Sequence, residues 1–168
     1  YGFVNNAGIN PSRNDILNTS LSDWEDTINT NLKGAFLCSK QAIKSMKKNS
    51  QGSIVNISSV AAFGMQKRVA YSSSKAGMIG FTKSLARDHA SKNIRVNCIC
   101  PGYVPTNLVK SYLTNLSVKE KKDLFDRHPM GKLGSPEDIA FATSFLLSNK
   151  AKWITGIALN VDGGYSIF

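Results

Sequence analysis

The chain has 168 residues and a formal net charge of +10, which comes from 21 Lys and Arg against 11 Asp and Glu. Its length fits one domain with a sizeable core, and a hydrophobic content of 42% excludes a disordered or collagen-like chain. Because no apolar run reaches membrane-spanning length and the basic residues are scattered without interleaved aromatics, we expect neither a membrane nor a nucleic-acid partner.

The first segment, YGFVNNAG, is an apolar run that ends in Asn-Asn and glycine, which predicts a buried strand entering a loop. The segment has no initiator Met and no preceding loop. We therefore expect the chain to begin inside a sheet, as a piece cut from a longer protein.

A long helix is predicted over about residues 23–48, because Ser22 and Asp23 can cap it and apolar residues recur at helical spacing behind them. Asn31 lies in the middle of this helix, where asparagine is a poor helix former. We expect a local break at Asn31, with Asn29 as the alternative position.

Strands and helices alternate through the rest of the chain. The predicted elements are a strand over 53–58, a helix over 70–91, a strand over 94–100, short helices over 105–127, a helix capped at Ser135 that reaches Leu147, and a strand over 156–161. Three cysteines without metal-ligand spacing, Cys38, Cys98 and Cys100, indicate a reduced, cytoplasmic setting and no metal. Cys98 and Cys100 are expected to be small buried residues on one side of their strand.

This alternation predicts an α/β fold, in which one domain over residues 1–168 contains a doubly wound parallel sheet flanked by helices on both faces. Ligands of such sheets bind beyond the carboxyl ends of the strands. The polar and glycine-containing segments that follow the first three strands lie there, namely residues 5–8, Ser58 with Ser59, and residues 101–106. We therefore expect one site to collect them.

Tyr71 and Lys75 stand four residues apart in a predicted helix, so both side chains lie on one face about one turn apart. A cation roughly 5 Å from the phenol favours the phenolate by about 3 kcal/mol at an effective dielectric constant near 20. This corresponds to a fall of about two units in the pKa of Tyr71. The spacing therefore predicts a tyrosine that can exchange a proton with an alcohol or a carbonyl.

Six motifs occur in an order that identifies a family. They are NNAG (5–8), NLKGAF (31–36), NISS (56–59), YSSSK (71–75), PGYVPT (101–106) and VDGG (161–164). In these motifs the chain resembles the short-chain dehydrogenase/reductase family over all 168 residues. The resemblance implies a Rossmann-like fold that lacks the family's N-terminal βαβ units and their TGxxxGxG turn, so the chain corresponds to the C-terminal two-thirds of a member.

The resemblance also implies a catalytic role for four residues. Tyr71 would be the general acid or base, and Lys75 would lower the pKa of Tyr71 and bind the nicotinamide ribose. Ser59 would bind the substrate oxygen, with Ser58 as a close competitor for that role. NLKG selects Asn31 as the residue whose backbone carbonyl holds a water in a proton relay to Lys75.

The cofactor implied by the resemblance is NAD or NADP. Asn5, Ala7 and Gly8 would line its adenosine and ribose side. The nicotinamide would lie against the PGYVPT segment, in which Pro105 stands where family members often have an acidic or polar residue. The residues implied there are Pro101, Gly102, Val104 and Thr106, together with Tyr71 and Lys75.

Residues 105–130 would form a substrate lid. Leu108, Tyr112, Leu113 and Met130 are candidate substrate contacts or packing residues in it, whereas His89 and His128 are expected on the surface and in a loop.

The implied function is interconversion of a secondary alcohol and a ketone, on a small-molecule substrate of a 3-oxoacyl-carrier-protein reductase or a sugar or alcohol dehydrogenase. A homotetramer is expected through helices 32–48 and 70–91. The alternative is a truncated, catalytically incompetent family member that serves as a structural or assembly partner.

Overall fold

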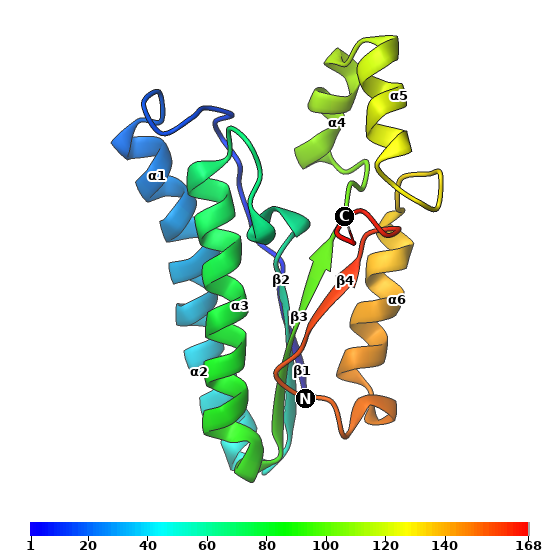
Figure 1. The fold of residues 1–168 in the computed structure, drawn as a ribbon. Coiled ribbons are helices and arrows are strands. Elements are labelled where there is room, and N and C mark those ends of the chain that lie inside the picture. Colours follow the sequence, from blue (N-terminus) through cyan, green and yellow to red (C-terminus); the bar gives the residue numbers. More distant parts are fainter. Residues whose placement is uncertain (168) are drawn as a thin grey trace.

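The computed structural model describes residues 1–167 and contains a four-stranded sheet in the order β1-β2-β3-β4. Each neighbouring pair of strands is parallel, as the sequence predicts for βαβ units. Strands β1 and β4 form the two edges of the sheet (Figure 1). The strands are β1 (Gly2–Asn5), β2 (Gly52–Ile57), β3 (Ile94–Pro101) and β4 (Ala158–Val161).

Helices cover both faces of the sheet, which confirms the doubly wound arrangement (Figure 1). One face carries α1 (Leu21–Ile28), α2 (Gly34–Lys48) and α3 (Val69–His89), and the other carries α6 (Pro136–Leu147). Helices α4 (Asn107–Asn115) and α5 (Val118–Asp126) stand beyond the carboxyl ends of the strands. Single 3₁₀ turns occupy Val60–Phe63, Ala90–Lys92 and Asn149–Ala151. Within residues 1–167, no helix has both the length and the apolarity that a membrane crossing requires.

The core lies in two layers, because successive residues of a strand point to opposite faces of the sheet. On β3, Val96, Cys98 and Cys100 pack with residues of α2 and α3, whereas Ile99 packs toward Leu146 of α6. Both cysteines of β3 are fully buried on one side of the strand, as expected from the sequence.

The prediction of a single helix over 23–48 is wrong in two ways: the helix starts earlier, and it is interrupted. Helix α1 begins after Ser20, whose hydroxyl accepts a hydrogen bond from the Asp23 N–H (3.0 Å), so Ser20 rather than Ser22 is the cap. A π-helical turn, Asn29–Lys33, separates α1 from α2 and contains buried Asn31. This turn confirms the predicted local break at Asn31.

Helix α6 starts where the sequence predicts. The Ser135 hydroxyl accepts from the Asp138 N–H, and the Asp138 carboxylate accepts from the Ser135 N–H (2.7 Å), which forms a reciprocal capping box. Pro136 follows at the first helical position, where its missing N–H costs nothing. This end of α6 is thereby fixed at the side of the sheet where the strands end.

Candidate active site

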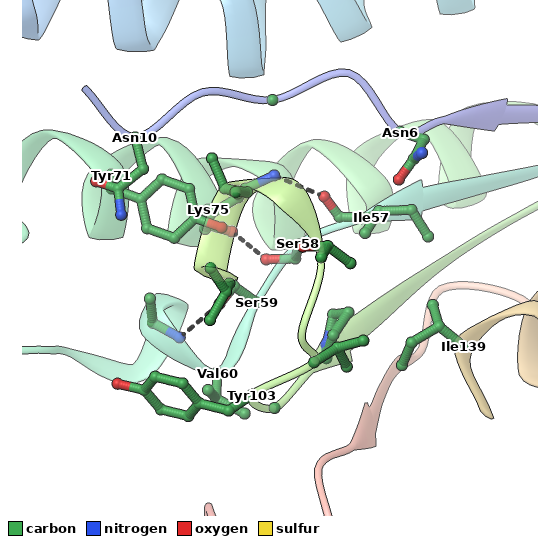
Figure 2. A pocket seen from close by; sticks show the side chains of 18 of the residues that line it. Asn6, Asn10, Ile57, Ser58, Ser59, Val60, Tyr71, Lys75, Tyr103 and Ile139 are labelled. Carbon is green, nitrogen blue, oxygen red and sulfur yellow. Dashed lines mark hydrogen bonds between the residues drawn. The ribbon is translucent and has the colours of Figure 1, made fainter. Parts of the chain in front are cut away.

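A cavity of about 590 Å³ lies at the carboxyl ends of the strands, where the sequence predicts a ligand site (Figure 2). Its walls come from the segments that follow β1, β2 and β3, from the start of α3 and from one face of α6. Among the predicted site residues, those that line it are Gly8, Ser58, Ser59, Tyr71, Lys75, Pro101, Gly102, Val104 and Thr106.

Lys75 lies one turn of α3 from Tyr71, with its Nζ 5.6 Å from the centroid of the phenol ring. The side chain is only 3% exposed, and Nζ donates a hydrogen bond to the Ile57 carbonyl at the end of β2 (2.9 Å; Figure 2). Burial lowers the pKa of Lys75 to about 8, because the interior disfavours the charged ammonium. The lysine is therefore held in place at the strand end rather than solvated.

The predicted fall in the pKa of Tyr71 is not found. Burial raises the pKa of the phenol above its ordinary value, while a hydrogen bond with Ser59 and the charge of Arg68 act in the opposite direction. The distance between Tyr71 and Lys75 is close to the expected one, but removal of the phenol from water outweighs nearby charge. Tyr71 is thus a protonated hydroxyl at neutral pH.

The two candidate serines have different surroundings. Ser58 is buried, and its hydroxyl donates to the Lys75 backbone carbonyl (2.7 Å), which ties the end of β2 to α3. Ser59 is half-buried, its hydroxyl accepts from the Ala61 N–H (3.1 Å), and its side chain is near enough to the phenol to lower the pKa of Tyr71. Ser59 therefore stands beside the phenol at the cavity, whereas Ser58 has a fixed backbone partner.

Asn31 connects the loop after β1 to α3. Its Oδ1 accepts from the Ile9 N–H (2.8 Å), and its Nδ2 donates to the Ile9 carbonyl and to Ser74 Oγ (both 3.0 Å). The Ser74 hydroxyl in turn donates to the Tyr71 carbonyl (2.8 Å). This chain of hydrogen bonds fixes the backbone of Tyr71 relative to the loop of residues 6–10.

Gly8 lies against Lys75. A Cβ placed on Gly8 would be 3.3 Å from Lys75 Nζ and 3.5 Å from Asn31 Oδ1, so a larger residue would press on the ammonium. Gly102 is more tightly enclosed, because its Cβ would lie 2.8 Å from Asp162 Cα. Close backbone approach at Gly102 therefore requires the absence of a side chain, whereas at Gly8 a side chain would displace the Lys75 ammonium by a few tenths of an ångström.

Two residues predicted to line the cofactor site do not line the cavity. The Asn5 side chain is buried in the sheet, where its Nδ2 donates to Ser39 Oγ (2.8 Å) and Asn56 Oδ1 (2.7 Å), and Ala7 is exposed away from the cavity. Asn5 points into the protein because alternate residues of a strand face opposite sides. The neighbouring Asn6 lines the cavity instead.

The predicted lid residues separate into two groups. Leu108 lines the cavity, whereas Tyr112, Leu113 and Met130 do not. His128 follows α5 in a turn, as expected for a loop residue, but it is not on the surface: it is only 2% exposed, with Nδ1 2.7 Å from the Leu124 carbonyl. His128 packs among aromatic rings that include Tyr103 and Tyr165, and His89 is half-buried at the end of α3.

Sequence reasoning missed several residues of the wall, including Arg13, Arg68, Tyr103 and the α6 residues Ile139 and Thr143. Arg68 precedes Tyr71 by three residues, and this helical spacing could have revealed it. Arg13 and the α6 residues come to the cavity through tertiary packing, which no local pattern encodes. Within residues 1–167, no cluster of metal-ligating side chains is present.

Residues 1–166 match the family described as Enoyl-(Acyl carrier protein) reductase. The 3-oxoacyl-[acyl-carrier-protein] reductase FabG of Aquifex aeolicus is 43% identical over 163 residues, which are 96% of this chain and 64% of that protein. An uncharacterized oxidoreductase of Thermotoga maritima is also 43% identical, over 96% of this chain and 65% of that protein. The chain thus spans less than two thirds of the length of these relatives.

Solved structures of similar proteins have the same fold. A protein of Agrobacterium tumefaciens assigned as a 2-deoxy-D-gluconate 3-dehydrogenase, with bound NADP, superposes with a TM-score of 0.94 at 37% identity, over 99% of this chain and 68% of that one. ElxO with NADP bound superposes with a TM-score of 0.92 at 37% identity, over 99% of this chain and 67% of that one. The chain belongs to the short-chain dehydrogenase/reductase family.

Proposed function

We propose that this chain carries the proton-transfer site of an NAD(P)-dependent oxidoreductase that interconverts a secondary alcohol and a ketone. The observation that supports this most directly is the grouping of Tyr71, Ser59 and Lys75 at one cavity. The phenol and the Ser59 side chain both line this cavity, Ser59 acts to lower the pKa of the phenol, and the ammonium lies one helical turn away.

The same cavity has the residues to hold the nicotinamide end of the cofactor. Gly8 leaves its backbone open beside Lys75, and Pro101, Gly102, Val104 and Thr106 form the adjoining wall. NADP is bound in the similar structures from A. tumefaciens and of ElxO, which supports NAD or NADP here. When bound, the nicotinamide supplies or accepts the hydride.

Tyr71 would transfer the proton. Because burial keeps the phenol protonated at neutral pH, it can donate to the carbonyl oxygen of a ketone as the general acid of reduction. The Ser59 hydroxyl would donate to the same oxygen and stabilise the charge that develops there. Ser58 is the weaker candidate for this role, because its hydroxyl already donates to the Lys75 carbonyl.

Lys75 and Asn31 would support that step. The buried ammonium, with a pKa of about 8, can give up and regain a proton near neutral pH and so resupply the phenol. Asn31 fixes the loop of Gly8 and Ile9 against α3, and the π-helical turn around it loosens the regular backbone hydrogen bonding. We infer that its carbonyl holds the water that connects Lys75 to solvent.

The assembly is proposed to be a homotetramer that contacts through α2 and α3, in the cytoplasm. Phe36 and Leu37 of α2 are 48% and 51% exposed, so two large apolar side chains of this helix are open to contact with a second copy. The two buried thiols of β3 suit a reducing compartment. Helices α4 and α5 form the proposed lid over the substrate.

The test is a screen for ketone reduction with NADH and NADPH, and for alcohol oxidation with NAD and NADP, by the gene product that contains this chain. The absorbance of the reduced nicotinamide measures turnover. We expect turnover of ketones with at least one of the two cofactors. Absence of turnover over a broad panel of ketones and alcohols would favour the non-catalytic assembly partner instead.

A further inference from the structure

Two arginines face the candidate active site without an acidic partner. Arg13, in the loop after β1, and Arg68, directly before α3, both line the cavity. No Asp or Glu is among the lining residues, and in the described part of the chain the single ion pair is Lys122–Asp126, on the surface of α5. With Lys75, the cavity therefore collects three cationic side chains and no carboxylate.

The two guanidinium groups share one aromatic ring. Arg13 Cζ lies 3.6 Å and Arg68 Cζ lies 5.9 Å from the centroid of the Tyr112 ring on α4. Stacking on the ring fixes the plane of Arg13 while leaving the edge of the guanidinium, which carries its N–H groups, free to bind. Tyr112 thus orients Arg13 mainly through the face of its ring, and Arg13 Nη1 is left without a hydrogen-bond partner in residues 1–167.

These donors are largely unused. Arg13 Nη1 is fully shielded from solvent and has no hydrogen-bond partner within residues 1–167. Arg68 is only 9% exposed, and its one hydrogen bond is a long contact from Nη1 to the Lys67 carbonyl (3.5 Å). A shielded donor without a partner costs about 1–3 kcal/mol, so the pair is poised to bind an acceptor.

The two like charges also disfavour each other. Burial lowers the pKa of Arg13 and that of Arg68 below the ordinary value, and the charge of Arg13 lowers the pKa of Arg68 further. An anion bound by both guanidinium groups would offset their mutual repulsion and would accept hydrogen bonds from the unpartnered N–H groups. Carboxylate and phosphate are the anions whose oxygens match the fork of an arginine.

We propose that Arg13 and Arg68 bind an anionic group of the substrate, a carboxylate or a phosphate, at the opposite end of the molecule from the carbonyl that Tyr71 and Ser59 hold. This inference rests on the proposed function and names its substrate class. Arg68 precedes Tyr71 by one helical turn, and its charge acts on the Tyr71 phenol. The anionic group therefore lies only a few bonds from the reacting ketone.

The experiment compares matched ketones that differ only in charge. Levulinate is set against methyl levulinate, and dihydroxyacetone phosphate against dihydroxyacetone, with the gene product that contains this chain. The first pair tests a carboxylate and the second a phosphate. We expect the anionic member of at least one pair to have the higher kcat/KM.

The Arg13→Gln and Arg68→Gln variants should lower kcat/KM for the anionic ketone about tenfold to a hundredfold, which corresponds to the loss of a charged hydrogen bond. Arg13→Gln should change kcat/KM for the neutral ketone less than about twofold. Arg68→Gln also removes a charge that acts on the Tyr71 phenol, so its effect is measured as the change in the ratio of kcat/KM between the anionic and the neutral ketone. Arg87→Gln changes an exposed arginine of α3, the helix that Arg68 precedes; it is the matched control and should leave kcat/KM for both ketones unchanged. Arg68→Lys, which keeps the charge but not the fork, should recover part of the loss.

Calorimetric titration of the same ketones separates this inference from the proposed function. If no ketone is turned over but levulinate or dihydroxyacetone phosphate binds and Arg13→Gln abolishes the binding, the anion site stands and the proposed function fails. If ketones are turned over but the variants lower kcat/KM equally for the charged and the neutral ketone, the proposed function stands and the anion site is overturned. The anion site is also overturned if the wild-type protein turns over or binds the anionic and the neutral ketone equally well, or if none of the four ketones binds.

Discussion

The Tyr71 hydroxyl lines the cavity together with Ser59 and Lys75, and burial raises its pKa, so it stands there as a proton donor. Tyr71→Phe removes the proton donor and keeps the ring that packs beside Lys75. We expect kcat to fall at least about a thousandfold, in line with the loss of general acid catalysis and of a bond to the reacting oxygen. Cofactor affinity should change little.

Stopped-flow or steady-state kinetics measures the turnover of this variant, and fluorescence titration measures its NADPH affinity. Tyr165→Phe is the matched control, because Tyr165 lies in the aromatic cluster with His128 rather than on the cavity wall. Retained turnover in Tyr71→Phe would remove Tyr71 from the catalytic role.

Lys75 makes the stability of the protein depend on pH. The pKa of the folded-state ammonium is about 8 and that of the unfolded chain is near its ordinary 10.5, so the unfolded state holds the proton more tightly. Stability is therefore full above the unfolded pKa and is lost as pH falls toward 8. From pH 7 to about pH 9.5, the unfolding free energy of the wild type should rise by about 2 kcal/mol relative to that of Lys75→Met.

Urea unfolding of both proteins at the two pH values measures this difference, because groups other than Lys75 titrate in both and cancel. Lys83→Met, at an exposed position of α3, should show no such pH-dependent difference from wild type. A constant gap between wild type and Lys75→Met would mean that the ammonium is solvated.

At the scale of elements, the π-helical turn between α1 and α2 is tied to the site through Asn31. Asn31→Ala removes its three hydrogen bonds to Ile9 and Ser74 and leaves the Ile9 groups without these partners. We expect a loss of about 2 kcal/mol in unfolding free energy, with a fall in turnover, because Ser74 also holds the Tyr71 carbonyl.

Asn29→Ala is the control for this change, because Asn29 is exposed at the start of the same turn. This substitution should lower the unfolding free energy by less than about 0.5 kcal/mol. Chemical denaturation measures both variants. If both substitutions lower the unfolding free energy equally, helix propensity in the turn, and not the hydrogen bonds of Asn31, determines the loss of stability.

The elements were predictable where a local pattern controls them. The capping box at Ser135 placed the start of α6, and the poor helix propensity of Asn31 indicated the break in the first helix. The direction of the Tyr71 pKa shift was wrong because the degree of burial depends on packing that the four-residue spacing does not contain. Arg13 was missed for the same reason, since its loop reaches Tyr112 only in the folded chain.

At the scale of the whole molecule, the proposed homotetramer depends on the apolar outer face of α2. The double substitution Phe36→Ser with Leu37→Ser should convert the tetramer to smaller species, because it removes the large exposed apolar groups. Light scattering coupled to size exclusion measures the mass. Val118→Ser, at an 87% exposed position of α5, is the control and should remain tetrameric; a monomeric wild type would contradict the proposal.

Strand β1 is an edge strand that, within the described residues, pairs only with β2. In a parallel strand, alternate N–H and C=O groups point away from the paired neighbour, so the outer edge of β1 is a template for adding another strand. Phe3 and Val4 are half-buried, so a strand added beside β1 would also cover part of their side chains. The outer edge of β1 is therefore a place where a further strand, from another part of the protein or from a second copy, can pair with this chain.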